Sequence, residues 1–147
     1  MKIEIMNNSH LDKIFEISKI FYTSDALDHK VPMDIVERNI NIALSDDNSL
    51  VGYVFLEDNE IAGFSYVTTY HETEVGGKCV QILDLYVDDK FRGRGFAKEY
   101  FKYVFDKYSD AKRFRLEYVK DNERAISLYK KMGFEELSYG QMVIDKI

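Results

Sequence analysis

The sequence contains little cysteine and proline and no tryptophan. Cys79 is the only cysteine among the 147 residues, which excludes an intrachain disulfide and a zinc cluster built on cysteines. The histidines, His10, His29 and His71, lie far apart without the spacing of metal ligands, so we expect no metal site. A lone cysteine is typical of proteins in a reducing compartment, and we expect this one to be cytoplasmic.

Long apolar runs and an excess of positive charge are also missing. The first twenty residues interleave charged and apolar side chains, so that segment predicts neither a signal peptide nor a membrane span. The formal net charge is −6, from 20 basic and 26 acidic side chains. An acidic balance disfavours a nucleic-acid-binding surface. We therefore expect no nucleic acid and no membrane as partner, and cationic or neutral ligands instead.

What is present is the composition of an ordinary folded protein. Hydrophobic residues make up 46% and charged residues 31% of the chain, which leaves room for a packed core. The length fits a single domain over residues 1–147. No internal repeat, linker or low-complexity segment interrupts the chain.

The first half of the chain predicts a strand, two helices and a hairpin. Ser9 followed by Asp12 is typical of a capping box at a helix start, and an apolar stripe at helical spacing continues to Tyr22. Residues 23–30 are polar and predict a loop. Pro32 fits the first turn of a second helix, which continues to Ala43. The β-branched and aromatic segments 50–56 and 61–70 predict two strands joined by a tight turn over residues 57–60.

The second half of the chain predicts parallel strands. Residues 80–87 are apolar on both faces except at Gln81 and Asp84, which indicates a central strand. Its alternation places Val80, Ile82 and Tyr86 on one face and Leu83, Leu85 and Val87 on the other. A long amphipathic helix is predicted over residues 97–108, then a strand over 114–119, a helix over 123–132 closed by Gly133, and final β structure over 134–144.

This order of elements predicts an α+β fold. A strand, a helix of more than a dozen residues and a second strand form a parallel crossover, because a short turn cannot connect parallel strands. The preceding hairpin is antiparallel. We therefore expect a sheet that is antiparallel in its first half and parallel in its second.

The segment Arg92-Gly93-Arg94-Gly95-Phe96-Ala97 lies between the central strand and the long helix. Two glycines allow a tight turn, and the free backbone N–H groups at a helix start favour an anion such as a phosphate or pyrophosphate. A plain tight turn is the competing interpretation. The residues after these glycines match neither the P-loop pattern nor the dinucleotide fingerprint.

Two segments resemble one protein family. Arg92-x-x-Gly95-x-Ala97, preceded by Leu85-Tyr86-Val87-Asp88, is similar to the signature of GNAT-type N-acetyltransferases. About thirty residues later, Asn122-x-x-Ala125-x-x-Leu128-Tyr129-x-x-x-Gly133-Phe134 resembles the downstream helix of that family. The order of elements described above agrees with the family along the whole chain.

The resemblance implies a fold and a co-substrate. The fold is a GNAT-like three-layer α+β arrangement, whose mixed central sheet has an antiparallel first half and a splayed parallel pair in the centre, flanked by helices. Acetyl-CoA would lie between the splayed strands, with its pyrophosphate on the amides of residues 92–97 and its pantetheine along the preceding strand. The cofactor-binding residues this implies are Leu85, Tyr86, Val87, Arg92, Gly93, Arg94, Gly95, Phe96, Ala97, Asn122, Ala125 and Tyr129.

The implied reaction transfers an acetyl group from a thioester to an amine, so an amine proton must leave and a thiolate must gain one. Tyr129 matches the general acid of the family, whereas its periodicity alone predicts a packing residue. The base is left open between Asp84, Glu117 and water. Asp84 interrupts an apolar strand, where an unpaired carboxylate is costly. Cys79 is expected to be a core residue, which disfavours an acyl-cysteine route.

The sequence therefore predicts an acetyl-CoA-dependent N-acetyltransferase that acts on a primary amine of a small molecule or peptide by direct transfer in a ternary complex. A CoA-binding sensor or scaffold without catalysis is the alternative, and an interaction protein whose glycines only form a turn is a third. The acidic loop with Asp25 and Asp28, beside His29, would wall the acceptor side and favours a cationic amine. Nothing in the sequence decides between a monomer and a homodimer.

Overall fold

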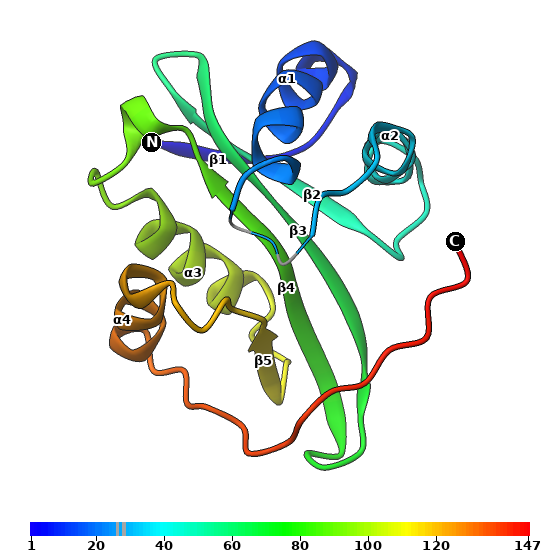
Figure 1. Ribbon diagram of the computed structural model, residues 1–147. Coiled ribbons are helices and arrows are strands. Elements are labelled where there is room, and N and C mark those ends of the chain that lie inside the picture. The colour runs from blue at the N-terminus through cyan, green and yellow to red at the C-terminus, as the bar shows by residue number, and fades with distance from the viewer. Residues whose placement is uncertain (26, 28) are drawn as a thin grey trace.

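The computed structural model describes residues 1–25, 27 and 29–147. These residues form one sheet in the order β1-β2-β3-β4-β5, in which only β4 and β5 run parallel (Figure 1). The arrangement confirms the predicted α+β class. The elements are β1 (Lys2–Ile5), α1 (Leu11–Tyr22), α2 (Met33–Ala43), β2 (Val51–Glu57), β3 (Glu60–Glu72), β4 (Gly77–Val87), α3 (Phe96–Lys107), β5 (Arg113–Leu116) and α4 (Glu123–Lys131), with 3-10 turns at Asn8–His10 and Asp89–Phe91.

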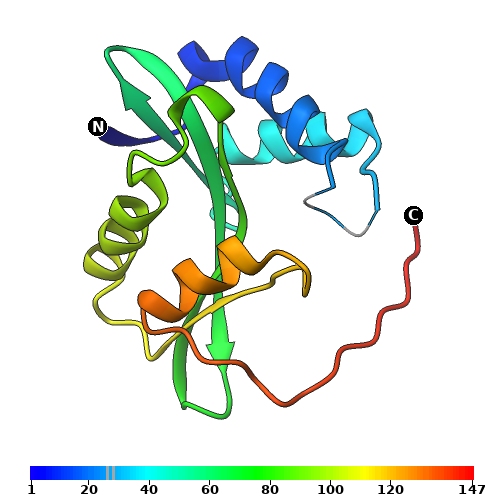
Figure 2. The same cartoon turned by 60° about the vertical axis from the view of Figure 1, so that its left-hand side comes forward.

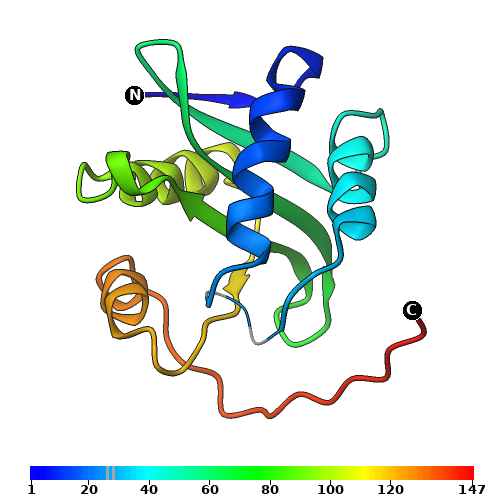
Figure 3. The same cartoon turned by 45° about the horizontal axis from the view of Figure 1, so that its top comes forward.

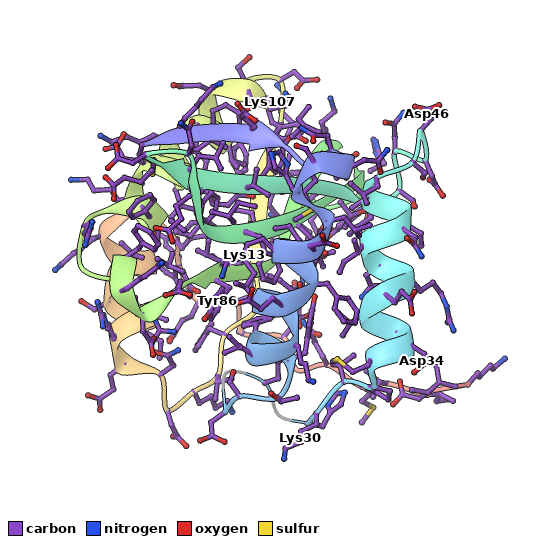
Figure 4. The ribbon with its side chains drawn as sticks, turned by 90° about the horizontal axis from the view of Figure 1, so that it is seen from above. Lys13, Lys30, Asp34, Asp46, Tyr86 and Lys107 are labelled. Atoms are coloured by element: carbon purple, nitrogen blue, oxygen red, sulfur yellow. The ribbon has the colours of Figure 1, made fainter. Side chains whose placement is uncertain are left out.

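Helices cover the sheet on both faces, which gives three layers (Figure 2). One core lies under α1 and α2 and contains Phe21, Tyr22 and Tyr86. The other lies under α3 and α4 and contains Val80, Ile82 and Phe101. Figure 4 shows Tyr86 inside the molecule beside α1, whereas the charged side chains of Asp46 and Lys107 lie at its rim. None of the helices in the described part of the chain is long and apolar enough to cross a membrane.

The start of the first helix differs from the prediction. Asn7 caps the 3-10 turn that leads into α1: its side-chain oxygen accepts the backbone N–H of Ser9 at 2.9 Å, whereas the N-cap of α1 itself, His10, makes no side-chain capping bond. The His10 ring returns the bond by accepting the backbone N–H of Asn7 at 3.2 Å. The expected pairing of Ser9 with Asp12 was wrong because asparagine is an equally strong cap and histidine here replaces the usual glutamate.

The turn after β2 and the end of α4 confirm two predictions. Asp58 and Asn59 both have positive φ, 50° and 63°, as the tight turn of a two-residue hairpin requires. Gly133 follows α4 with φ 95°, and the backbone N–H of Phe134 bonds to the Tyr129 carbonyl at 3.0 Å. Glycine suits this position because it closes the helix in a left-handed conformation without strain from a side chain.

A β-bulge interrupts β4 in the middle. Ser65 of β3 faces Leu85 and Val67 faces Ile82, so the single residue Tyr66 stands opposite both Leu83 and Asp84. The extra residue reverses the alternation of side chains along the strand. The prediction that Val80 and Ile82 share a face with Tyr86 was therefore wrong, because Val80 and Ile82 pack toward α3 while Tyr86 packs toward α1.

The predicted β structure over residues 134–144 was wrong. Residues 134–147 form neither strand nor helix and extend past the ends of β3 and β4 (Figures 1 and 3). Tyr139 is 67% exposed and Val143 80% exposed. The segment has the composition of a strand, but composition does not show whether a sheet edge lies within reach. The strand predicted over 114–119 also ends early, at Leu116, so β5 is the last strand of the described sheet.

Candidate functional site

The parallel strands β4 and β5 separate along their length. Among the described residues they pair only from Cys79 with Arg113 to Ile82 with Leu116, and β4 then continues to Val87 with no described strand on that side. A cavity of about 280 Å³ lies where the two strands part. It is lined by Phe21, Leu27, His29, Ile82, Leu83, Asp84, Leu85, Phe101, Leu116, Glu117, Tyr118, Val119, Asn122, Ala125 and Tyr129.

The structure brings the three residues predicted to be catalytic into this one cavity. Asp84 comes from the bulge of β4, Glu117 from the first residue after β5, and Tyr129 from α4. Glu117 is exposed, whereas Asp84 and Tyr129 are half-buried. The cavity therefore places two carboxylates and a phenol around the same space.

Asp84 is held from two sides. Its side-chain oxygen Oδ2 accepts a hydrogen bond from the Tyr22 phenol of α1, and its backbone carbonyl accepts one from the Ser65 hydroxyl of β3. Burial raises the pKa of the Asp84 carboxyl, the Tyr22 hydrogen bond lowers it in part, and the negative charge of Glu117 raises it further. The result is a carboxylate that takes up a proton more readily than an exposed aspartate does.

Tyr129 both packs against neighbouring rings and lines the cavity. Its ring packs edge-on against Phe101, with centroids 5.8 Å apart and the planes at 89°, and lies 6.2 Å from the ring of Phe134. The same residue lines the cavity. Burial raises the pKa of the Tyr129 phenol, so it keeps its proton at neutral pH. A protonated, rigidly held phenol at a cavity wall can donate a proton.

The predicted anion-binding loop has the expected geometry. Gly93 and Gly95 have φ of 77° and 87°, and α3 begins directly afterwards at Phe96. The backbone N–H groups of residues 93–98 have no backbone acceptor among the described residues. A Cβ added at Gly95 would meet no atom within 4 Å, so the space in front of the loop is open. Backbone donors arranged in this way at a helix start can bind an anion.

The arginines of the loop are held by neighbouring acceptors. Arg92 donates to the Val87 carbonyl at 2.9 Å and pairs with Asp89 at 2.5 Å. Arg94 pairs with Glu57 at 3.1 Å. Both guanidinium groups are exposed and keep further N–H donors for an anion.

The other residues predicted to bind the cofactor differ in how far their side chains are exposed. The side chains of Tyr86 and Phe96 are buried in the two cores, so only their backbones are available to a ligand. Leu85, Val87 and Ala97 are half-buried. Asn122 caps α4 by accepting the backbone N–H of Ala125 at 3.1 Å, and both residues line the cavity.

The described residues that line the cavity include no lysine or arginine. His29 lies here, as expected, together with Phe21 and Leu27. Asp25 is exposed, and Asp28 lies outside the described residues. Sequence reasoning missed Phe21 and Tyr22 because both belong to an ordinary apolar helix stripe, and nothing in the sequence links them to β4.

The structure also shows where Cys79 lies and whether the described residues gather possible metal ligands. Cys79 is fully buried at the end of β4 where the strands still pair, and it does not line the cavity. It is therefore a core residue, as predicted. Within residues 1–25, 27 and 29–147, no group of three or more histidine, cysteine, aspartate or glutamate side chains could hold a metal ion.

Comparisons with known proteins agree with this geometry. Residues 11–134 match the model of the acetyltransferase (GNAT) family. No curated protein sequence matches the chain. Solved structures that share the fold include a possible acetyltransferase from Clostridium difficile 630, with a TM-score of 0.82 at 20% identity over 99% of this chain and 97% of that one.

Two further solved structures share the fold at similarly low identity. AAC(6')-Iy in complex with the bisubstrate analogue CoA-S-monomethyl-acetylneamine has a TM-score of 0.78 at 20% identity, over 99% of this chain and 98% of that one. The ribosomal-protein-alanine N-acetyltransferase from Brucella melitensis biovar Abortus 2308 has a TM-score of 0.73 at 18% identity, over 99% of each chain.

Proposed function

Because this chain belongs to the acetyltransferase (GNAT) family and is an acyltransferase, we propose that it transfers an acetyl group from acetyl-CoA to a primary amine of a small, cationic molecule. The observation that carries the proposal is the cavity between β4 and β5, where Asp84, Glu117 and Tyr129 surround one space. AAC(6')-Iy, which shares the fold, binds an analogue that joins CoA to an acetylated amine.

The described residues fit acetyl-CoA. The unpartnered amides of residues 93–98 and the open space before Gly95 would hold its pyrophosphate. The side of β4 beyond Ile82 would hold its pantetheine, because no strand of the described residues pairs with that stretch there. When bound, acetyl-CoA supplies the acetyl group as a reactive thioester.

Two residues of the cavity would each carry one of the two proton transfers that the reaction needs. Asp84 takes a proton from the ammonium form of the acceptor, since its raised pKa makes it a stronger base than an exposed aspartate. Tyr129 donates its phenol proton to the sulfur that leaves. Glu117 is exposed at the cavity and attracts the cation without losing much solvation.

The screen that tests this proposal measures release of the free CoA thiol from acetyl-CoA in the presence of a panel of acceptors. The panel covers polyamines, amino acids, aminosugars, aminoglycosides and peptide N-termini, together with hydroxyl and anionic compounds as controls. We expect release with at least one cationic amine, and a product heavier by one acetyl group. Binding of acetyl-CoA without release for any acceptor would instead favour a CoA-binding sensor or scaffold.

A further inference from the structure

The hydrogen bond between Tyr22 and Asp84 joins two layers of the fold. Tyr22 lies in the last turn of α1 and is only 3% exposed, and its hydroxyl donates to Asp84 Oδ2. The side chain of Asn39, on the neighbouring helix α2, lies near this phenol and lowers its pKa in part. Figure 3 shows α1 and α2 side by side over the sheet. The hydrogen bond from Tyr22 therefore ties the end of α1 to the carboxylate on β4.

Packing alone does not explain a tyrosine at this position. The ring of Tyr22 lies 4.9 Å from that of Phe21 in an apolar cluster, where phenylalanine would fill the same volume. The hydroxyl is the only polar group that tyrosine adds to phenylalanine. It donates a hydrogen bond to Asp84, the carboxylate that interrupts β4. Burial is the largest cause that raises the pKa of the Tyr22 phenol, and the charge of Asp84 raises it further. The phenol therefore keeps its proton and remains a hydrogen-bond donor at neutral pH.

We propose that Tyr22 is a positioning residue that fixes Oδ2 of Asp84 from α1, so that Oδ1 faces the amine in the cavity. No hydrogen bond to Oδ1 is found among the described residues. The inference rests on the proposed role of Asp84 as the base. It extends that role by making the acceptor side of the reaction depend on α1, which lies outside both sequence motifs.

Other titratable groups lie near Asp84, and one of them provides a control for the role of Tyr22. Tyr66 of β3 is also a buried phenol near Asp84, but its hydroxyl has no hydrogen-bond partner among the described residues. Glu117 faces Asp84 from the chain after β5, and Tyr129 and His29 line the same cavity. Among these groups, only Tyr22 donates a hydrogen bond to the Asp84 side chain within the described residues.

A donated hydrogen bond stabilises the charged form of a carboxyl and lowers its pKa. The substitution Tyr22→Phe should therefore raise the pKa of Asp84, and Tyr66→Phe should leave it near the wild-type value. The direct measurement is the titration of the Asp84 side-chain carboxyl carbon by NMR in the free protein, which needs no acceptor. The same shift should move the acid limb of kcat/KM to higher pH with the acceptor found in the screen.

We expect Tyr22→Phe to lower kcat/KM for the amine by roughly tenfold to hundredfold at neutral pH, with unchanged affinity for acetyl-CoA and unchanged circular dichroism. Equal titration curves for Tyr22→Phe and wild type, or equal shifts for Tyr22→Phe and Tyr66→Phe, would overturn the inference.

The substitution Asp84→Asn separates this inference from the proposed function. If Asp84→Asn turns over like wild type, Asp84 is not the base and the positioning role of Tyr22 falls with it. If Asp84→Asn loses activity while Tyr22→Phe matches wild type in both titration and turnover, the base assignment stands and only the positioning role is overturned.

Discussion

Tyr22 of α1 donates a hydrogen bond to Asp84 of β4, although 62 residues separate them in the sequence. The contact exists because the bulge at Leu83 and Asp84 turns the carboxylate toward α1. In a regular strand with Val80 and Ile82 packed against α3, residue 84 would face α3 as well. One extra residue in the strand thus decides which layer the carboxylate meets.

The first prediction concerns stability and pH. The pKa of Asp84 is raised in the folded protein, so the folded state holds this proton more tightly than the unfolded chain does. The associated stability is present below about pH 4, the ordinary aspartate value, and is lost as the pH rises through the raised pKa. Asp84→Asn removes the charge but keeps an oxygen that can accept from Tyr22. It should raise Tm by a few degrees, about 2–5 °C, at pH 7.

Thermal melts of both proteins at pH 7 and near pH 4 check this prediction. The gain of Asp84→Asn should shrink at the lower pH, where the wild-type carboxyl is neutral as well. A lower Tm for Asp84→Asn at pH 7 would show that the buried charge is compensated and that its pKa is not raised.

Both motifs and most of the elements could be predicted from the sequence, because apolar spacing reports which face of a helix or strand is buried. Gly95 could be singled out from the local glycine pattern before a helix, whereas Tyr129 was singled out only by the resemblance to the family. The bulge in β4 could not be predicted from the sequence, because a strand can accept one extra residue without any change in its composition. Tyr22 was missed for a related reason: a buried tyrosine in an apolar stripe looks the same whether or not its hydroxyl meets a carboxylate.

The second prediction tests the loop at the start of α3. Gly95→Asp should weaken acetyl-CoA binding at least tenfold, because it places a negative side chain in the open space before the free amides. Wild type at 100 times the dissociation constant should gain about 2.7 kcal/mol from acetyl-CoA. Thermal shift and calorimetry measure both effects.

Gly76→Asp is the matched control for the loop variant. Gly76 also has a positive φ, 60°, and open space around it, but it lies in the turn between β3 and β4. Both variants should lose about 1–2 kcal/mol of stability from backbone strain. Only Gly95→Asp should lose binding, and equal affinities in the two variants would refute the placement of the pyrophosphate.

The third prediction concerns Tyr129. Tyr129→Phe keeps the ring packing against Phe101 and should leave fold and acetyl-CoA affinity unchanged. Turnover should fall by about 10²- to 10⁴-fold if the phenol is the general acid. Because burial raises the pKa of Tyr129, any alkaline limb that reports this phenol should lie above about pH 10, the ordinary tyrosine value. The measurement is kcat against pH.

Tyr118→Phe is the control for this variant. Tyr118 also lines the cavity, but its hydroxyl donates to Glu136 at 2.8 Å. It should keep turnover within about twofold of wild type, a margin below 0.5 kcal/mol. Turnover of Tyr129→Phe within the same margin, with chemistry rate-limiting, would make Tyr129 a packing residue.

The fourth prediction concerns the charge of the acceptor. Glu117→Gln should raise KM for a cationic amine by roughly threefold to tenfold and change kcat little, since an exposed carboxylate attracts the cation before reaction. The effect should decrease at high salt. Glu135→Gln removes the same charge from a residue that does not line the cavity and should leave KM unchanged. Equal KM values in both variants would contradict the electrostatic role of Glu117.

Direct transfer within the cavity is the central claim, and initial rates of CoA release over a grid of acetyl-CoA and acceptor concentrations test it most directly. Reciprocal plots that intersect, with no acetyl group found on the protein by intact mass, are the predicted result, because amine and thioester then meet in one ternary complex. Parallel lines with an acetylated protein would contradict the account, since they indicate a covalent intermediate that the buried Cys79, away from the cavity, could not form without rearrangement.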